Sequence, residues 1–103
     1  MAYNLKWKPE AEREFNNLDK AIQQQALTQF KKLTNSPELG QPLGNKAGFD
    51  LTGYLKLYFF QKKYRIVYEL DRKKNEVTIF AIGKREDLKV YRNLAKRLGG
   101  ELA

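Results

Sequence analysis

The sequence predicts an α+β domain in the order strand, two helices, three strands and a final helix. Residues 9–33 place apolar side chains at helical spacing, whereas residues 54–83 alternate as strands do. Short connections between the last three strands favour an antiparallel meander, and the first strand must pair with it to be stable. We therefore expect a small antiparallel sheet packed against the two N-terminal helices, with a C-terminal helix after the sheet.

The first half of the chain carries the first strand and the two helices. Residues 2–8, "AYNLKWK", alternate loosely and predict a short strand. Pro9 suits the first turn of a helix, and the acidic residues after it favour a helix N-terminus. Residues 34–45 predict a loop, because two prolines and two glycines interrupt any period. A second helix is expected over 20–33, with a buried stripe of Ile22, Ala26, Phe30 and Leu33.

The second half of the chain carries the meander. Residues 53–60, "GYLKLYFF", and 62–70, "KKYRIVYEL", each alternate with a period of two. Residues 76–83, "EVTIFAIG", are nearly all apolar, which is typical of a central strand covered on both faces. A last helix is expected over 86–98, where two glycines end it.

Composition excludes several classes of protein. A chain of 103 residues with 42% hydrophobic residues favours one folded domain over a disordered segment. It has no cysteine and no histidine, so disulfides and the usual zinc ligand sets are excluded. No apolar run approaches the roughly 20 residues that span a membrane, and the N-terminus has no apolar signal-peptide region. We therefore expect a cytoplasmic protein without a membrane partner.

The net charge of +8 is concentrated in the second half of the chain. Residues 1–50 hold seven Lys/Arg and six Asp/Glu, whereas residues 51–103 hold thirteen and six. Such a field attracts phosphate backbones, acidic proteins or anionic lipid. The alternative is a solvated basic surface without a specific partner.

Three basic residues fall where the meander brings strands together. Lys56 and Arg65 lie on the polar sides of adjacent strands, and Arg85 follows the end of the third. Residues on one face of neighbouring strands lie about 5 Å apart when directly opposed, so these cations converge on one sheet face. Fixed cations stabilise the charge of a phosphodiester transition state. On the sequence alone each of these cations is more typical of a solvated surface position, and helical spacing alone places Tyr91 in the core.

Beyond these patterns, the sequence resembles a known toxin family. The segment "YRIVYEL", a polar hairpin, and "VTIFAIGKRED" followed by "VY" resemble the RelE toxins of the RelE/ParE superfamily. The resemblance extends to the opening "AYNLKWKPEAEREFNNLD" and the "PLGN" loop. It implies a single RelE-like toxin domain over residues 1–103, the toxin half of a bacterial or archaeal toxin–antitoxin pair.

The resemblance implies an activity and its partners. RelE toxins enter the ribosomal A site and cut mRNA there without a metal or other cofactor. The 2′-hydroxyl of the message attacks the neighbouring phosphate and leaves a 2′,3′-cyclic phosphate and a 5′-hydroxyl. The implied partners are the ribosome, mRNA and a cognate antitoxin that blocks the toxin.

Residue roles follow from the matched motifs. The arginine of the "YR" strand is Arg65, a clamp on the scissile phosphate, and that of the "GKR" corner is Arg85, beside the leaving 5′ oxygen. Tyr91 follows six residues later, to stack on a base or take the 2′-hydroxyl proton. Lys56 is the one strand lysine, because the segment before "KKYR" departs from the family pattern. The candidate RNA- and ribosome-binding residues are Lys62, Lys63, Lys84, Lys89 and Arg92.

Two other functions remain open at this point. ParE-like toxins share the fold and inhibit DNA gyrase, and they tend to lack the arginine and tyrosine that Arg85 and Tyr91 match. A non-enzymatic RNA-binding or partner-binding module is the third reading. Growth arrest on expression argues against that module, and arrest with intact mRNA points to gyrase.

Overall fold

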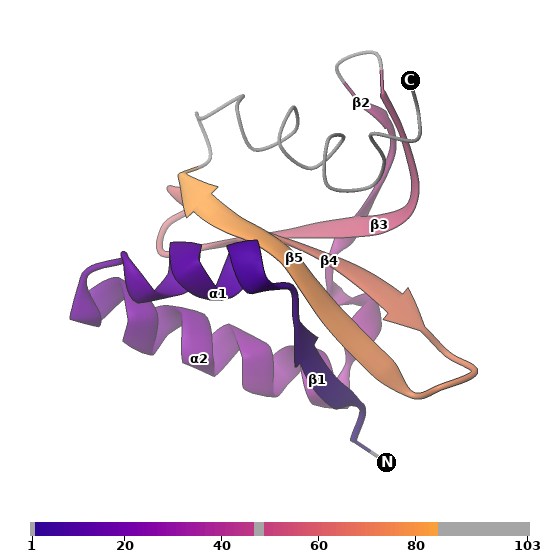
Figure 1. Cartoon of the computed structure of the whole chain (residues 1–103), viewed down its shortest axis with the longest axis horizontal. Coiled ribbons are helices and arrows are strands. Elements are labelled where there is room, and N and C mark those ends of the chain that lie inside the picture. Colours follow the sequence, from indigo (N-terminus) through magenta and orange to yellow (C-terminus); the bar gives the residue numbers. More distant parts are fainter. Residues whose placement is uncertain (1, 47–48, 85–103) are drawn as a thin grey trace.

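A computed structural model describes residues 2–46 and 49–84 and has an α+β architecture (Figure 1). Five strands form one sheet, and two helices pack on one side of it. The final helix expected over 86–98 lies outside the described residues. The elements in chain order are β1 (Asn4–Trp7), α1 (Pro9–Asn16), α2 (Lys20–Asn35), a short 3₁₀ helix η1 (Pro37–Leu39), β2 (Gln41–Lys46), β3 (Phe49–Phe59), β4 (Tyr64–Asp71) and β5 (Glu76–Lys84).

The strands are arranged in the order β1-β5-β4-β3-β2. The expected antiparallel meander of β3, β4 and β5 is confirmed. β5 lies between β1 and β4, so the apolar run at 76–83 is an interior strand as predicted. β1 pairs with β5 in parallel, and the two helices after β1 carry the chain to β2 at the opposite edge of the sheet. The sheet is therefore mixed rather than wholly antiparallel.

The prediction of a loop over 34–45 is wrong for its second half, where the chain forms β2. This strand lies at the edge of the sheet, so one of its sides has no neighbouring strand. Pro42 has no backbone N–H to donate, and an edge strand tolerates this on its unpaired side. Gly44 has a φ of +58°, and the pairing with β3 shifts between Pro42 and Gly44. A bulge at this point accommodates Pro42 and Gly44, the residues that hid the two-residue alternation of this strand in the sequence.

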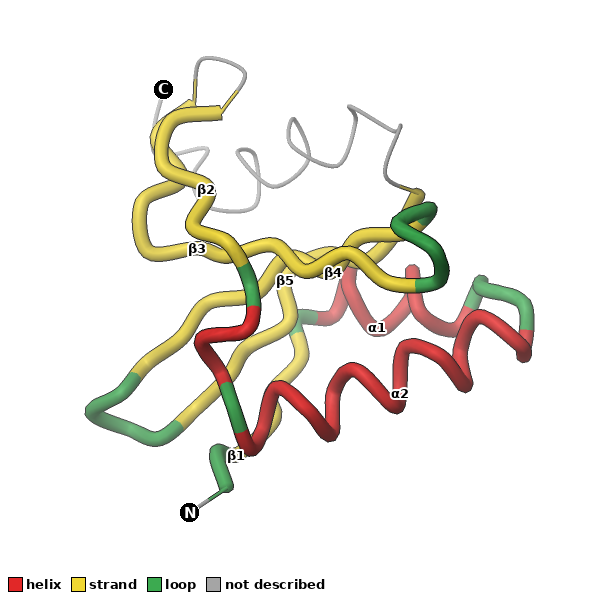
Figure 2. The backbone as a smooth tube through the Cα atoms, turned by 180° about the vertical axis from the view of Figure 1, so that it is seen from behind, coloured by secondary structure: helices red, strands yellow, loops and turns green. Residues whose placement is uncertain are grey.

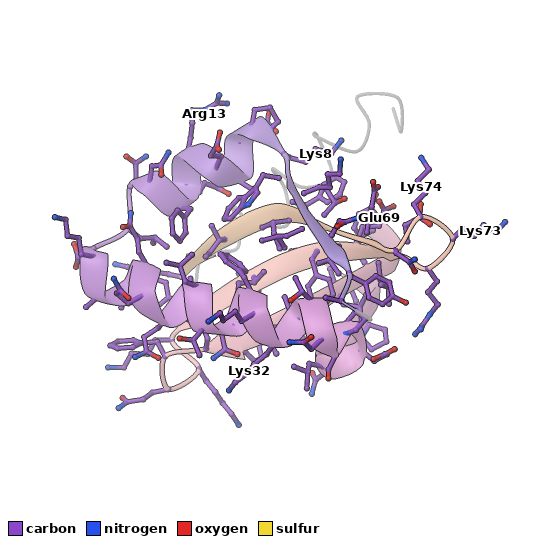
Figure 3. All side chains as sticks on the ribbon, turned by 90° about the horizontal axis from the view of Figure 1, so that it is seen from below. Lys8, Arg13, Lys32, Glu69, Lys73 and Lys74 are labelled. Atoms are coloured by element: carbon purple, nitrogen blue, oxygen red, sulfur yellow. The ribbon has the colours of Figure 1, made fainter. Side chains whose placement is uncertain are left out.

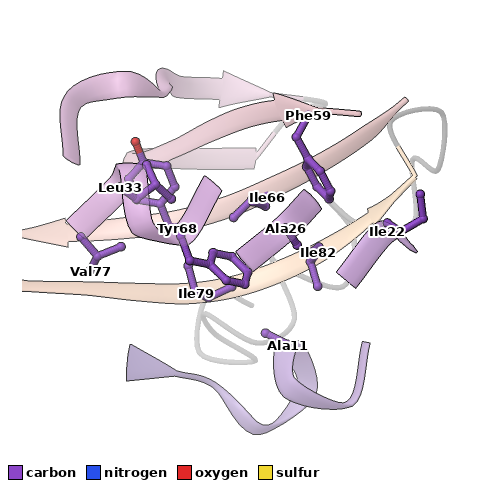
Figure 4. Packing of buried hydrophobic residues seen from close by; sticks show 11 residues of the cluster. Ala11, Ile22, Ala26, Leu33, Phe59, Ile66, Tyr68, Val77, Ile79 and Ile82 are labelled. Carbon is purple, nitrogen blue, oxygen red and sulfur yellow. The ribbon is translucent and has the colours of Figure 1, made fainter. Parts of the chain in front are cut away.

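The core lies between the sheet and the helices, which cover the same side of it (Figure 2). The predicted stripe of α2 is confirmed, since all four of its residues are buried. It packs against strand residues of β4 and β5, including Ile66, Tyr68 and Ile79 (Figure 4). The rings of Trp7, Phe15 and Phe30 lie 5.0–6.0 Å apart and join β1, α1 and α2.

A bulge in β5 explains why its sequence lacks a simple alternation. Val67 pairs with Ala81 and Tyr68 pairs with Ile79, so Phe80 is an extra residue in the ladder. The bulge lets Ile79 and Ile82 both enter the core on the helix side, although they are three residues apart. It also turns Phe80 and Ala81 together toward the opposite face of the sheet.

Candidate functional site

The candidate site lies on the sheet face opposite the helices. Leu57, Ile66 and Ile82 form one row across β3, β4 and β5, and this row packs in the core. Side chains alternate along a strand, so the next row, Tyr58, Arg65 and Gly83, points to the other face. Figure 1 shows these three strands side by side.

Arg65 is the only charged residue that is buried among residues 2–44 and 53–84, with 2% of its surface exposed. Its Nη2 donates a hydrogen bond to the carbonyl oxygen of Lys84, 3.4 Å away. Burial of a guanidinium is costly unless partners hold the group, so fully buried arginines are uncommon. The contact joins the "YR" strand to Lys84 in the "GKR" segment.

Lys56 lies two residues before Tyr58 and therefore on the same face as Arg65. Its ammonium donates a hydrogen bond to the Tyr58 hydroxyl over 3.0 Å and lies 5.0 Å from the centre of the Tyr58 ring. Tyr58 is directly opposite Arg65 in the β3–β4 register. Two cations and a phenol are thus brought together on this face, and Tyr58 is half-buried rather than enclosed.

The other predicted lysines are placed differently. Lys62 and Lys63 lie in the exposed turn between β3 and β4, at the end of the site. Lys84 is exposed, but its pairing with Tyr64 puts it on the helix side of the sheet rather than beside Arg65. The remaining predicted site residues lie outside the described part of the chain: Arg85, Lys89, Tyr91 and Arg92.

Basic side chains occur well away from this site too. Arg13 on α1, Lys32 on α2 and Lys73 and Lys74 in the β4–β5 turn project in different directions (Figure 3). Net charge alone therefore does not define the site. The burial of Arg65 and its neighbours distinguishes it from these solvated cations.

A second group on the same face was not foreseen from the sequence. Tyr54 packs edge-on against Phe80 at 5.0 Å, and the Lys8 ammonium lies 5.1 Å from the centre of that ring. Burial and the adjacent Glu69 carboxylate raise the pKa of Tyr54 to about 12. Glu69 therefore holds this phenol in its protonated form. The contact between Tyr54 and Phe80 depends on the bulge at Phe80, which the sequence pattern does not indicate.

Sequence reasoning also missed Tyr58, since a tyrosine in an alternating strand is an ordinary surface residue. The only signal in the sequence was its position two residues after Lys56, which puts both side chains on the same face of one strand. The hydrogen bond and the register with Arg65 required the structure.

Two classes of site find no support in the described residues. No group of three or more Asp and Glu residues is placed there to hold a metal ion. The helices at 9–16 and 20–35 are too short or too polar to cross a membrane. The described residues instead place two cationic side chains, Lys56 and Arg65, on one face of the sheet.

An apolar groove of about 590 Å³ lies on the other side of the molecule, between β1 and α2. Leu5, Trp7 and Phe30 form its floor, and Leu27 at its rim is 48% exposed. The groove opens on the helix side of the sheet and is separate from the basic face. It contains no constellation of polar groups suited to catalysis.

Comparisons with known proteins agree with this fold. The sequence matches the family described as ParE toxin of type II toxin-antitoxin system, parDE, over residues 5–89. An Escherichia coli protein described as a RelE-like toxin is 31% identical over 98 residues, covering 95% of this chain and 99% of that protein.

Solved structures of toxins are similar over most of the chain. A mutant E. coli RelE toxin in the free state matches with a TM-score of 0.77 and 26% identity, over 96% of this chain and 100% of that one. The intact E. coli RelBE toxin–antitoxin complex contains a chain that matches with a TM-score of 0.66 and 26% identity, over 82% of this chain and 99% of that one.

Proposed function

This chain belongs to the ParE toxin family of type II toxin–antitoxin systems, within the RelE/ParE superfamily, and from that premise we propose that it is a ribosome-dependent mRNA endoribonuclease. In this proposal it works in the cytoplasm, enters the A site and cuts the message there. Translation then stops because the message is severed. The reaction needs no metal or other cofactor.

The placement of Arg65 is the observation that carries the proposal. Its guanidinium is buried on the face that also presents Lys56, and it is held against the end of β5 by the Lys84 carbonyl. A guanidinium donates two parallel hydrogen bonds to phosphate oxygens, and a preoriented one stabilises the transition state without reorganising. A merely solubilising arginine gains nothing from such burial.

The proposed reaction is attack by the 2′-hydroxyl on the adjacent phosphate. Arg65 clamps the non-bridging oxygens, and Lys56 adds positive charge on the same face. Arg85 is proposed to stabilise the leaving 5′ oxygen, and Tyr91 to stack on a base beside the scissile bond. The products are a 2′,3′-cyclic phosphate and a 5′-hydroxyl, and positioning and charge supply most of the rate.

The other lysines are proposed to hold the RNA or the ribosome. Lys62 and Lys63 extend the positive charge of the site along the exposed turn. Contacts of this type are electrostatic and carry no sequence information, so they weaken as salt rises. The same role is proposed for Lys84, Lys89 and Arg92.

A cognate antitoxin is the proposed regulatory partner. The structural relatives include toxins in complex with an antitoxin or an antitoxin peptide, and their folds match this one. A chain with a net charge of +8 suits a partner that brings carboxylates to the basic face. Such a partner shields Lys56 and the exposed turn lysines, Lys62 and Lys63, from the ribosome.

Inhibition of DNA gyrase is the second candidate, favoured by the match to the ParE toxin family over residues 5–89. The two functions differ in their target, which is mRNA for the nuclease and DNA gyrase for the inhibitor. A gyrase inhibitor blocks supercoiling and leaves a ribosome-bound message intact.

The proposal is tested by incubating the purified protein with bacterial ribosomes that hold a defined codon in the A site. We expect cuts within that codon, and 5′-hydroxyl products, only when ribosomes are present. The same message without ribosomes is the control. Intact message under both conditions, together with loss of gyrase supercoiling, contradicts the proposal and establishes the second candidate.

A further inference from the structure

Building on the proposed nuclease, we infer that Tyr58 is a further catalytic residue, whose phenolic oxygen accepts the proton of the attacking 2′-hydroxyl. The Lys56 ammonium holds that oxygen in place by donating a hydrogen bond to it over 3.0 Å. The reaction in a site without histidine needs such an acceptor. Lys56 and Tyr58 together form the proton-accepting pair.

The register of the sheet places this phenol beside the phosphate clamp. Tyr58 and Arg65 are directly opposed on β3 and β4, so their Cβ atoms lie about 4.5–5.5 Å apart on the same face. A phosphate held by Arg65 therefore lies within reach of the Tyr58 ring. The 2′-hydroxyl that attacks this phosphate is attached to the adjoining ribose, which the phenol can approach from β3.

The charged side chains that face Tyr58 among the described residues are cationic. Among the described residues, Lys56 from its own strand and Arg65 from β4 face it, and β5 contributes the uncharged Gly83 to the same row. Lys62 and Lys63 lie in the turn just beyond the end of β3. Nearby positive charge stabilises a phenolate, as does a hydrogen bond donated to it by an ammonium group.

Tyr54 provides the opposite arrangement on the same strand and face. Burial and the Glu69 carboxylate, which lies opposite it on β4, disfavour loss of its proton. Tyr54 and Tyr58 are separated by four residues and differ in the sign of the charge that contacts the hydroxyl. The Tyr54 phenol is thus near a carboxylate, whereas the Tyr58 phenol accepts a hydrogen bond from an ammonium group.

The step balances in protons and electron pairs. The 2′ O–H bond breaks, its proton passes to the Tyr58 phenolate, and the 2′ oxygen forms a bond to phosphorus with the released electron pair. The bond from phosphorus to the 5′ oxygen breaks, and that oxygen keeps the electron pair and takes a proton from solvent water. Tyr58 then returns its proton to solvent.

The test compares single-turnover cleavage of ribosome-bound mRNA by the wild type, Tyr58→Phe and Tyr54→Phe. We expect Tyr58→Phe to slow cleavage about 10²-fold or more, the usual contribution of a proton acceptor. Tyr54→Phe removes a phenol from the same face and is expected to stay within about threefold of the wild type, since general acid–base catalysis does not involve it. Thermal unfolding of each variant establishes that it is folded.

A second substrate identifies the step in which Tyr58 acts. Sulfur in place of the bridging 5′ oxygen is a leaving group that needs no protonation. The Tyr58→Phe defect is expected to persist on this substrate, and the rise of the wild-type rate with pH is expected to disappear in the variant. Lys56→Met is expected to slow cleavage of both substrates, because the phenolic oxygen loses the hydrogen bond that holds it in place.

Each outcome has one meaning. Cleavage by Tyr58→Phe at the wild-type rate overturns the role of Tyr58 and leaves the proposed nuclease standing. Rescue of the variant by the sulfur substrate also overturns it, because Tyr58 then acts on the leaving group. Absence of cleavage by the wild type overturns the proposed nuclease and this role with it.

Discussion

At the scale of single residues, one buried hydroxyl fixes where the edge of the sheet begins. Tyr68 donates a hydrogen bond to the Pro37 carbonyl over 2.7 Å and accepts one from the Gly40 N–H over 2.9 Å. The segment between α2 and β2 is thereby attached to the middle of the sheet. The first residue of β2, Gln41, then pairs with Lys56, so this clamp supports the backbone of the candidate site.

Gly40→Ala is expected to lower the free energy of unfolding by about 1–3 kcal/mol, the usual cost of forcing extra atoms into a packed site. A Cβ at this position lies 2.5 Å from the Tyr68 hydroxyl and 2.7 Å from the Lys56 carbonyl oxygen, so the backbone must shift. Urea unfolding measures the loss. Leu39→Ala is the control, because the neighbouring Leu39 is 48% exposed and its truncation is expected to cost little.

The pH dependence of stability is expected to reveal Tyr54. Its folded pKa of about 12 lies above the ordinary value of 10, because of burial and Glu69. A raised pKa means that the stabilisation is fully present below pH 10 and is lost as the pH rises through about 12. Unfolding measured across this window should show a steeper loss for the wild type than for Tyr54→Phe. Parallel curves would contradict the assignment.

At the scale of elements, the β3–β4 turn is strained in a way that glycine would relieve. Phe60, Gln61 and Lys62 have φ angles of 52°, 57° and 62°, in the left-handed region that side chains disfavour. The Phe60 ring packs 6.1 Å from that of Tyr64, and Lys62 is a proposed RNA contact. Side chains are therefore retained at a turn whose backbone favours glycine.

Gln61→Gly is expected to raise the free energy of unfolding by about 0.5–1 kcal/mol, after allowing for the greater freedom of glycine in the unfolded chain. The exposed Gln25 within α2 is the matched control, since glycine there should instead lower it by about 1 kcal/mol. Thermal unfolding of both variants measures the two effects. A loss of stability in Gln61→Gly would mean that the side chain, not the backbone, sets the energy of the turn.

The helices and strands whose apolar residues follow a regular spacing were predictable from the sequence. The stripe of α2 and the alternation of β4 required only the spacing of Ile22, Ala26, Ile66 and Tyr68. β2 was missed because its proline and glycine are permitted by an edge position and a bulge, which are properties of the sheet rather than of the segment.

The candidate site was predictable in part, for a similar reason. The two-residue alternation of the strands predicted that Lys56 and Arg65 share one face of the sheet, and the strand register agrees. The burial of Arg65, the Lys56–Tyr58 hydrogen bond and the position of Lys84 on the other side depend on how strands are paired. No local pattern in the sequence encodes those contacts.

At the scale of the whole molecule, the two faces of the sheet differ in composition and in the role that we assign to them. The helix side buries the apolar side chains that stabilise the fold, including Leu33 and Ile79. The opposite side carries the polar and charged row that we propose binds RNA. The helices pack against the other side of this sheet, so the strands that carry Lys56 and Arg65 are supported by the core.

The central claim is that Arg65 clamps the scissile phosphate, and single-turnover cleavage of A-site mRNA on ribosomes tests it most directly. Arg65→Ala is compared with Arg72→Ala, which removes the same charge from an exposed residue paired with Glu38. We expect Arg65→Ala to slow cleavage by about 10²–10³-fold and Arg72→Ala to change it little. Equal slowing by both variants would mean that only net charge matters. Undiminished cleavage by a folded Arg65→Ala would contradict the clamp.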